Sequence, residues 1–126
     1  MRERMFTPDS ARLALHKLRP TAERMCKIYH TLEAKRNGPI VPEQRVDPAY
    51  FGLVERLHRA LGEIHECGVQ VKDVRSGLLD FPARRDGRTV CLCWKVGESS
   101  LEFWHEEDAG FAGRQRVDDD GPWEEA

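Results

Sequence analysis

The residues best suited to chemistry follow one another at the end of a strand-like run near the C-terminal end of the chain. His105 is succeeded by Glu106, Glu107 and Asp108, so carboxylates can converge on its imidazole ring. A histidine with carboxylates supplies the ligands of a hydrolytic metal site or the general base of a hydrolase. The alternative is a structural histidine that hydrogen-bonds to the backbone, because a single histidine rarely forms a metal site. The sequence leaves both roles open for His105.

The loop Gly110–Gln115 is a second candidate. Two glycines on either side of Phe111 allow the backbone to approach a ligand closely, and Arg114 can bind a phosphate or a carboxylate. The loop lacks the strand-to-helix context of a phosphate-binding loop, so this signal is weak. The structural alternative is a tight turn that buries Phe111 and pairs Arg114 with Asp108.

The candidate ligand-binding residues share polar or charged side chains that can meet near one end of a predicted sheet. They are His105, Asp108, Arg114, Gln115 and Asp80. A small anion suits them, since Arg114 supplies a cation. No cofactor is predicted, and a divalent metal held by His105 and Asp108 is the lesser alternative.

The cysteines favour a reduced, structural role. Cys91 and Cys93 place two thiols on one face of a strand, with Asp80 opposite Cys93. Their spacing fits neither common pattern of a structural zinc site, and no second ligand pair is present. Cys26 lies on the first predicted helix and Cys67 at the end of the second. We expect both to be buried and to act as small hydrophobic side chains.

A β-hairpin positions Asp80. Asp86-Gly87 predicts a type I′ turn between two strand-like runs, because both central residues of that turn need positive φ. The two-residue loop sets Asp80 opposite Cys93 and Phe81 opposite Leu92. Side chains alternate across a strand, so one face of this hairpin is apolar. That face carries Leu79, Phe81, Ala83, Val90, Leu92 and Trp94.

The next turn, at Gly97–Ser100, predicts a four-residue loop that leads into the strand bearing the histidine. This loop sets Leu92 opposite His105, so His105 lies at the end of the apolar face. Lys95 and Glu102 then form a cross-strand ion pair on the other face.

Two helices precede these strands. Thr7 and Pro8 predict the start of a long helix that ends near Asn37, and a second helix runs from Pro48 to a cap at Gly68. The predicted fold class is α+β, with a long antiparallel helix hairpin packed on a small antiparallel sheet of three to four strands. The apolar seam of the first helix is longer than that of the second, which predicts a homodimer unless the sheet covers the difference.

Length and composition indicate a single domain. The chain has 126 residues, which we divide into a domain over 1–116 and an acidic flexible tail over 117–126. A net charge of -2 argues against nucleic acid and acidic membranes as partners. No segment resembles a signal peptide or a membrane span, so we expect a cytoplasmic protein.

Three segments carry a family resemblance: GLLDFPARRDGR, CLCWKVGE and FWHEEDAGFAGRQ. They resemble the signature of a bacterial family known as domain of unknown function 2203. The resemblance covers Phe6 to Gln115, and Arg116 stands where the family usually has proline. It implies a single bacterial domain and transfers no activity.

Two classes of function remain. The first, which we favour, is a non-enzymatic binding or interaction module that uses the loop His105–Gln115. The second is a small metal-dependent or His/carboxylate hydrolase that uses His105, Asp108 and Asp80, with Arg114 as an anion clamp. No second histidine near His105 supports the enzyme.

Overall fold

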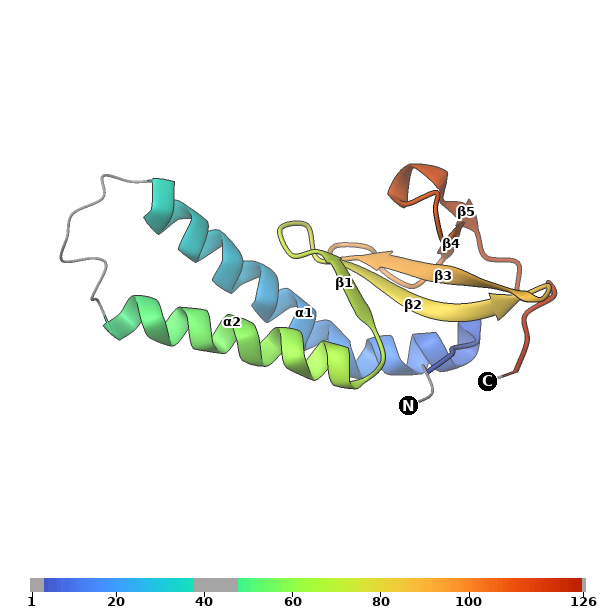
Figure 1. Cartoon of the computed structure of the whole chain (residues 1–126), viewed down its shortest axis with the longest axis horizontal. Coiled ribbons are helices and arrows are strands. Elements are labelled where there is room, and N and C mark those ends of the chain that lie inside the picture. Colours follow the sequence, from blue (N-terminus) through green and yellow to red (C-terminus); the bar gives the residue numbers. More distant parts are fainter. Residues whose placement is uncertain (1–3, 38–47, 126) are drawn as a thin grey trace.

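The computed structural model describes residues 4–37 and 48–125. Its elements are α1 (Pro8–Asn37), α2 (Pro48–Glu66), β1 (Gln70–Asp73), β2 (Leu78–Arg85), β3 (Arg88–Lys95), β4 (Phe103–Glu106), the 3-10 turn η2 (Phe111–Gly113) and β5 (Gln115–Arg116). The strands form one antiparallel sheet in the order β1-β2-β3-β4-β5 (Figure 1). The α+β class is confirmed, but the sheet has five strands rather than three to four. The added strand is β5, which forms because the chain turns back after β4 and pairs Gln115 with Trp104.

Local hydrogen bonds determine the helix boundaries, at capping residues that the sequence predicts. The Ser10 backbone N–H donates to Thr7 Oγ1 over 3.1 Å, and the Thr7 N–H donates to Ser10 Oγ over 2.9 Å. This reciprocal cap satisfies two backbone donors at the start of α1. After α2, Gly68 takes a φ of 83° and donates to the His65 carbonyl. Among the described residues, neither helix is apolar enough over sufficient length to cross a bilayer.

The core lies between the helices and one face of the sheet. Figure 1 shows α1 running along that face and then, beside α2, projecting past the sheet. One hydrophobic cluster contains Ala22 and Met25 of α1, Ile64 of α2, and Phe81 and Leu92 of the sheet. All six residues of the predicted apolar hairpin face are fully or almost fully buried in this cluster.

The predicted register between β2 and β3 is confirmed. Asp80 pairs with Cys93 and Phe81 pairs with Leu92. The turn that sets this register has φ of 51° at Asp86 and 78° at Gly87, as a type I′ turn requires. Asp80 and Cys93 therefore share the face of the sheet that points away from α1, which we call the outer face.

The predicted register between β3 and β4 is wrong by one residue. His105 pairs with Cys91, and Leu92 pairs with Trp104 instead of His105. The strand begins only at Phe103, because Leu101 leaves the sheet and packs into the core. A one-residue slip moves every side chain to the opposite face. His105 therefore joins the outer face, and Trp104 takes its place in the core.

The slip also removes the predicted Lys95–Glu102 ion pair. The Lys95 backbone N–H donates to Glu98 Oε1 over 2.7 Å, while Glu102 pairs with Arg116 at 3.7 Å. The connection is closed by Glu98, whose carbonyl also accepts the indole N–H of Trp94.

The free edge of β2 is covered by two segments from opposite ends of the chain. Phe6 donates its N–H to the Pro82 carbonyl over 2.7 Å, and Glu124 donates to the Arg84 carbonyl over 2.9 Å. Pro82 lacks a backbone donor and therefore suits an edge position. The division at residue 116 stays a prediction, but the described part of the expected tail makes defined contacts. Trp123 packs edge to face against Trp104, and Asp118 pairs with Arg85 at 2.9 Å.

Gly77 provides a test of this packing. It has a φ of 71°, and an added Cβ would lie 2.6 Å from Cys26 Sγ and against Val96 Cγ2. Gly87 has a φ of 78° but faces open space. We expect Gly87→Ala to lower the free energy of unfolding by about 1–2 kcal/mol through backbone strain alone. Gly77→Ala should cost about 1–3 kcal/mol more through overpacking. Equal losses in urea unfolding would contradict the packing between Gly77, α1 and β3.

Candidate functional site

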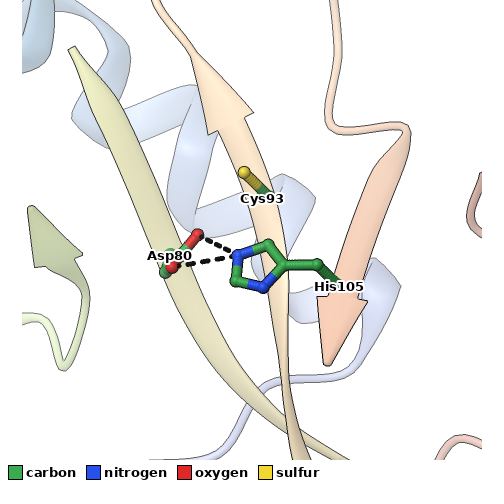
Figure 2. A group of neighbouring side chains, drawn as sticks. All are labelled: Asp80, Cys93 and His105. Carbon is green, nitrogen blue, oxygen red and sulfur yellow. Dashed lines mark hydrogen bonds and ion pairs between the residues drawn. The ribbon is translucent and has the colours of Figure 1, made fainter. Parts of the chain in front are cut away.

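The outer face of the sheet contains a buried polar cluster (Figure 2). Asp80 comes from β2, Cys93 from β3 and His105 from β4, so three neighbouring strands each supply one side chain. Their exposed fractions are 1%, 0% and 2%. Charged residues are almost never buried this fully without a partner. The cluster is therefore a built feature of the sheet.

Hydrogen bonds fix the orientation of the His105 ring. Nδ1 lies 2.7 Å from the carbonyl oxygen of Glu106, and Nε2 lies 3.1 Å from both carboxylate oxygens of Asp80. A carbonyl oxygen only accepts, so Nδ1 carries a hydrogen and donates it. A second proton lies between Nε2 and Asp80, because two lone pairs would otherwise face each other. His105 and Asp80 together are therefore a neutral, proton-sharing pair.

The two thiols of β3 surround this pair. Burial, and then the charge of Asp80, raises the pKa of Cys91 and Cys93 from the usual 9.0 to about 12. Asp80 therefore hydrogen-bonds to His105 and acts on both neighbouring thiols through its charge.

Three side chains of this cluster have the right chemistry to hold a metal ion. One donor atom each from Asp80, Cys93 and His105 lies within 4.8 Å of the others. The predicted metal ligands were His105 and Asp108. Of these, only His105 belongs to the cluster, and Asp108 is exposed.

A second polar cluster, centred on Arg114, lies beside the first. Its guanidinium donates to both carboxylate oxygens of Glu98, over 2.8 Å and 2.6 Å, and to the Cys93 carbonyl over 3.1 Å. Burial alone would raise the pKa of Glu98, but the hydrogen bonds from Arg114 and Lys95 lower it on balance. The predicted pairing of Arg114 with Asp108 is therefore wrong. The carboxylate of Glu98, sixteen residues earlier, takes both ends of the guanidinium.

The aromatic side chains around Arg114 differ in exposure. Arg114 Cζ lies 4.2 Å from the Phe103 ring centroid and 4.7 Å from that of Phe111. Lys95 Nζ lies 5.1 Å from the Phe111 centroid. Phe111 is nevertheless 46% exposed, so the predicted tight turn at Gly110–Gln115 is present but does not bury it.

The structure thus divides the five predicted ligand-binding residues into two groups. Asp80 and His105 meet in the buried pair. Arg114 lies next to them through the Cys93 carbonyl. Asp108 and Gln115 are exposed and contribute no side chain to either cluster. Glu98 was missed, because a carboxylate in a polar turn gives no signal that a distant arginine binds it.

A small cavity of about 150 Å³ opens elsewhere on the surface, near the start of α1. Its lining consists of Thr7, Pro8, Asp9, Asp119, Gly121, Trp123 and Glu125. None of the predicted ligand-binding residues lines it.

Removal of the shared acceptor tests the buried cluster. Asp80→Ala leaves the buried Nε2 of His105 without its partner, so we expect a loss of about 3–5 kcal/mol in the free energy of unfolding. Glu106→Gln is the matched control on β4, since Glu106 forms an exposed ion pair with Arg88. Its loss should be much smaller, because solvent screens exposed pairs. Similar losses for the two variants would contradict a buried, dependent cluster.

Thiol labelling tests the protonation of Cys91 and Cys93. With a pKa of about 12, about one thiol in ten thousand is ionised at pH 8, and both side chains are buried. We expect iodoacetamide to label the partly exposed Cys67 in the folded protein, and all four cysteines after unfolding. Peptide mass spectrometry reads out each position. Labelling of Cys93 in the folded state as fast as Cys67 would refute the burial.

The family comparison agrees with the landmarks of the fold. A family model described as "Uncharacterized conserved protein (DUF2203)" matches residues 4–117. No match was found among curated proteins or among solved structures. The matched range includes all five strands, the buried pair of Asp80 and His105, and Arg114 with its partner Glu98. The chain therefore belongs to the DUF2203 family of uncharacterized conserved proteins.

Proposed function

We propose that this protein is a non-enzymatic binding module that contacts its partner through the Phe111 surface, formed by Lys95, Phe103, Phe111 and Arg116. One observation carries the proposal. Phe111 is a large aromatic side chain, 46% exposed, on a turn that polar contacts hold in place. Exposed aromatic side chains on rigid supports are common anchors of protein interfaces.

The support for Phe111 comes from Arg114. Its guanidinium lies between the Phe103 and Phe111 rings and is fixed by Glu98 and the Cys93 carbonyl. Both terminal nitrogens of Arg114 are therefore occupied inside the protein. This supports a positioning role for Arg114 rather than the anion clamp that the sequence suggested.

Two other cations border the Phe111 surface. Lys95 lies at the Phe111 ring, and no carboxylate among the described residues pairs with its ammonium group. Arg116 is exposed, pairs with Glu102 at 3.7 Å and lies 5.5 Å from the Phe103 ring centroid. An apolar centre with cations at its rim suits an acidic partner that also carries an apolar side chain. The predicted small anion is the simplest member of that class.

The hydrolase alternative receives less support. A general base must reach the proton that it abstracts, within hydrogen-bond distance or through one water. The side chains of His105 and Asp80 are only 3% and 2% exposed, and they already hydrogen-bond to each other. Asp108, the third proposed catalytic residue, is not in contact with them.

We also propose that the protein is a homodimer, with a second copy covering the projecting part of the helices. Phe51 is 53% exposed there, and Val54, three residues on along the same side of the helix, is half-buried without joining the core cluster. Both lie in the N-terminal half of α2, where none of the described strands covers them (Figure 1). A symmetric second copy would bring the same apolar stripe to meet this one.

Peptide display tests the Phe111 surface. Random peptides selected on the immobilised protein should be enriched in acidic residues beside an apolar one. Phe111→Ala should weaken binding of the selected peptides at least about tenfold, as expected for an interface anchor. Leu13→Ala is the matched control, since Leu13 is a large hydrophobic side chain, 75% exposed, outside both this surface and the proposed dimer surface.

Both variants should unfold at the same urea concentration as the wild type, because both side chains are largely exposed. Selected peptides that bind Phe111→Ala as tightly as the wild type would refute the role of this surface. Enrichment of peptides without acidic residues would refute the role of its cations.

Light scattering on a sizing column tests the dimer. At tens of micromolar we expect twice the chain mass of 14.5 kDa. Phe51→Glu should shift the protein to the monomer mass, because it places a charge in the apolar stripe. A wild-type mass of one chain would end this proposal.

A further inference from the structure

We propose that Asp80, Cys93 and His105 form a structural binding site for a zinc-like divalent ion, with Cys91 as the fourth ligand. The inference does not depend on the Phe111 surface. It concerns the buried polar side chains that β2, β3 and β4 contribute to the outer face of the sheet. The ligands comprise one carboxylate, one imidazole and two thiols.

The register of the sheet brings these donors together. Asp80 pairs with Cys93, and His105 pairs with Cys91, so the four residues occupy adjacent positions on one face of three strands. Donor atoms of Asp80, Cys93 and His105 lie within 4.8 Å of one another. Ligands around a tetrahedral zinc ion stand about 3.3–3.8 Å apart, given bond lengths of about 2.0–2.3 Å. Side-chain movements of about 1 Å would therefore bring these three donors to ligand distances, and Cys91, which pairs with His105 on the same face, would turn its thiol to supply the fourth.

The His105 ring is already oriented as a metal ligand. Nδ1 donates to the Glu106 carbonyl over 2.7 Å, which directs Nε2 toward Asp80 and Cys93 (Figure 2). Metal-binding histidines almost always donate their other ring N–H to a carbonyl or carboxylate in this way. The Cys93 carbonyl is held as well, because it accepts a hydrogen bond from Arg114.

Charge balance and donor type select the ion. The Asp80 carboxylate and the thiolates of Cys91 and Cys93 supply three negative charges to a divalent cation, whose own charge stabilises both thiolates in the buried site. Imidazole and thiolate are poor ligands for magnesium and calcium, which take oxygen donors. Zinc accepts nitrogen, sulfur and carboxylate ligands in tetrahedral geometry, and cobalt(II) is a common spectroscopic substitute.

The burial of the site makes it structural rather than catalytic. All four candidate ligands have at most 5% exposure, so a substrate has no open position to occupy. On binding, the ion would replace the proton that Asp80 and His105 share and the thiol protons of Cys91 and Cys93, all of which pass to the solvent. The ion would then join through side chains three strands that already pair through their backbones.

The test loads the site during refolding, because the folded sheet covers it. Purified protein is unfolded in denaturant with chelator and reductant, freed of chelator, and refolded with cobalt(II) chloride. We expect one equivalent of cobalt to give a sulfur-to-cobalt charge-transfer band and tetrahedral d–d absorption, both of which zinc then displaces. Zinc should also raise the melting temperature of the refolded protein.

Variants assign the ligands. Cys93→Ser should remove or strongly weaken the charge-transfer band, and His105→Gln should lower cobalt affinity at least about tenfold. The matched control is the double variant Cys67→Ala/His65→Gln, which removes the accessible thiol and imidazole at the end of α2. Its spectrum and stoichiometry should equal those of the wild type.

Two results would overturn the site. One is refolded wild type that shows no charge-transfer band and no zinc-dependent change in melting temperature. The other is a band that survives in Cys93→Ser or disappears in the control variant, which would place the ion elsewhere. If Cys93→Ser fails to refold, the wild-type spectrum and the control variant still decide between these outcomes.

Discussion

The outer face of the sheet depends on the burial of Asp80 and His105 against each other. A carboxylate or imidazole loses its water when it is buried, and each needs a partner that restores the lost hydrogen bonds. Here the two side chains supply that partner for each other across β3, at 3.1 Å. The pair requires β2, β3 and β4 to keep one register, since a slip of one residue would place His105 on the opposite face. The buried pair thus stabilises one register of the sheet.

The buried pair also helps to position the loop that follows β4. His105 is the last buried residue before the chain leaves the sheet, and Arg114 brings the chain back by bonding to Glu98 and to the Cys93 carbonyl. Between these two points the chain forms η2 and exposes Phe111. Arg114 and Glu98 therefore contribute contacts that hold this loop in place. The proposed binding role of the loop depends on these contacts.

Sequence reasoning predicted the parts of the fold that short-range rules govern. Asp86-Gly87 determined the β2–β3 register because a two-residue type I′ turn permits one alignment. The β3–β4 connection failed because its seven residues, 96–102, allow several alignments. The alternation of apolar residues favoured one that kept Leu101 in the strand, whereas Leu101 packs into the core outside it. That single error placed His105 on the wrong face and hid its contact with Asp80. The Arg114–Glu98 contact could not be predicted from the sequence either, because it depends on the β3–β4 register.

The buried pair of Asp80 and His105 is tested most directly by nitrogen-15 NMR of the His105 ring, in protein labelled at histidine. Long-range nitrogen–proton correlations report which ring nitrogen carries hydrogen. We expect a hydrogen on Nδ1 that exchanges slowly with water, because it is buried and donated to the Glu106 carbonyl. We also expect Asp80→Ala to change the Nε2 resonance far more than the Nδ1 resonance. A ring with its hydrogen on Nε2 alone, or one that exchanges like the exposed His58, would contradict the buried pair.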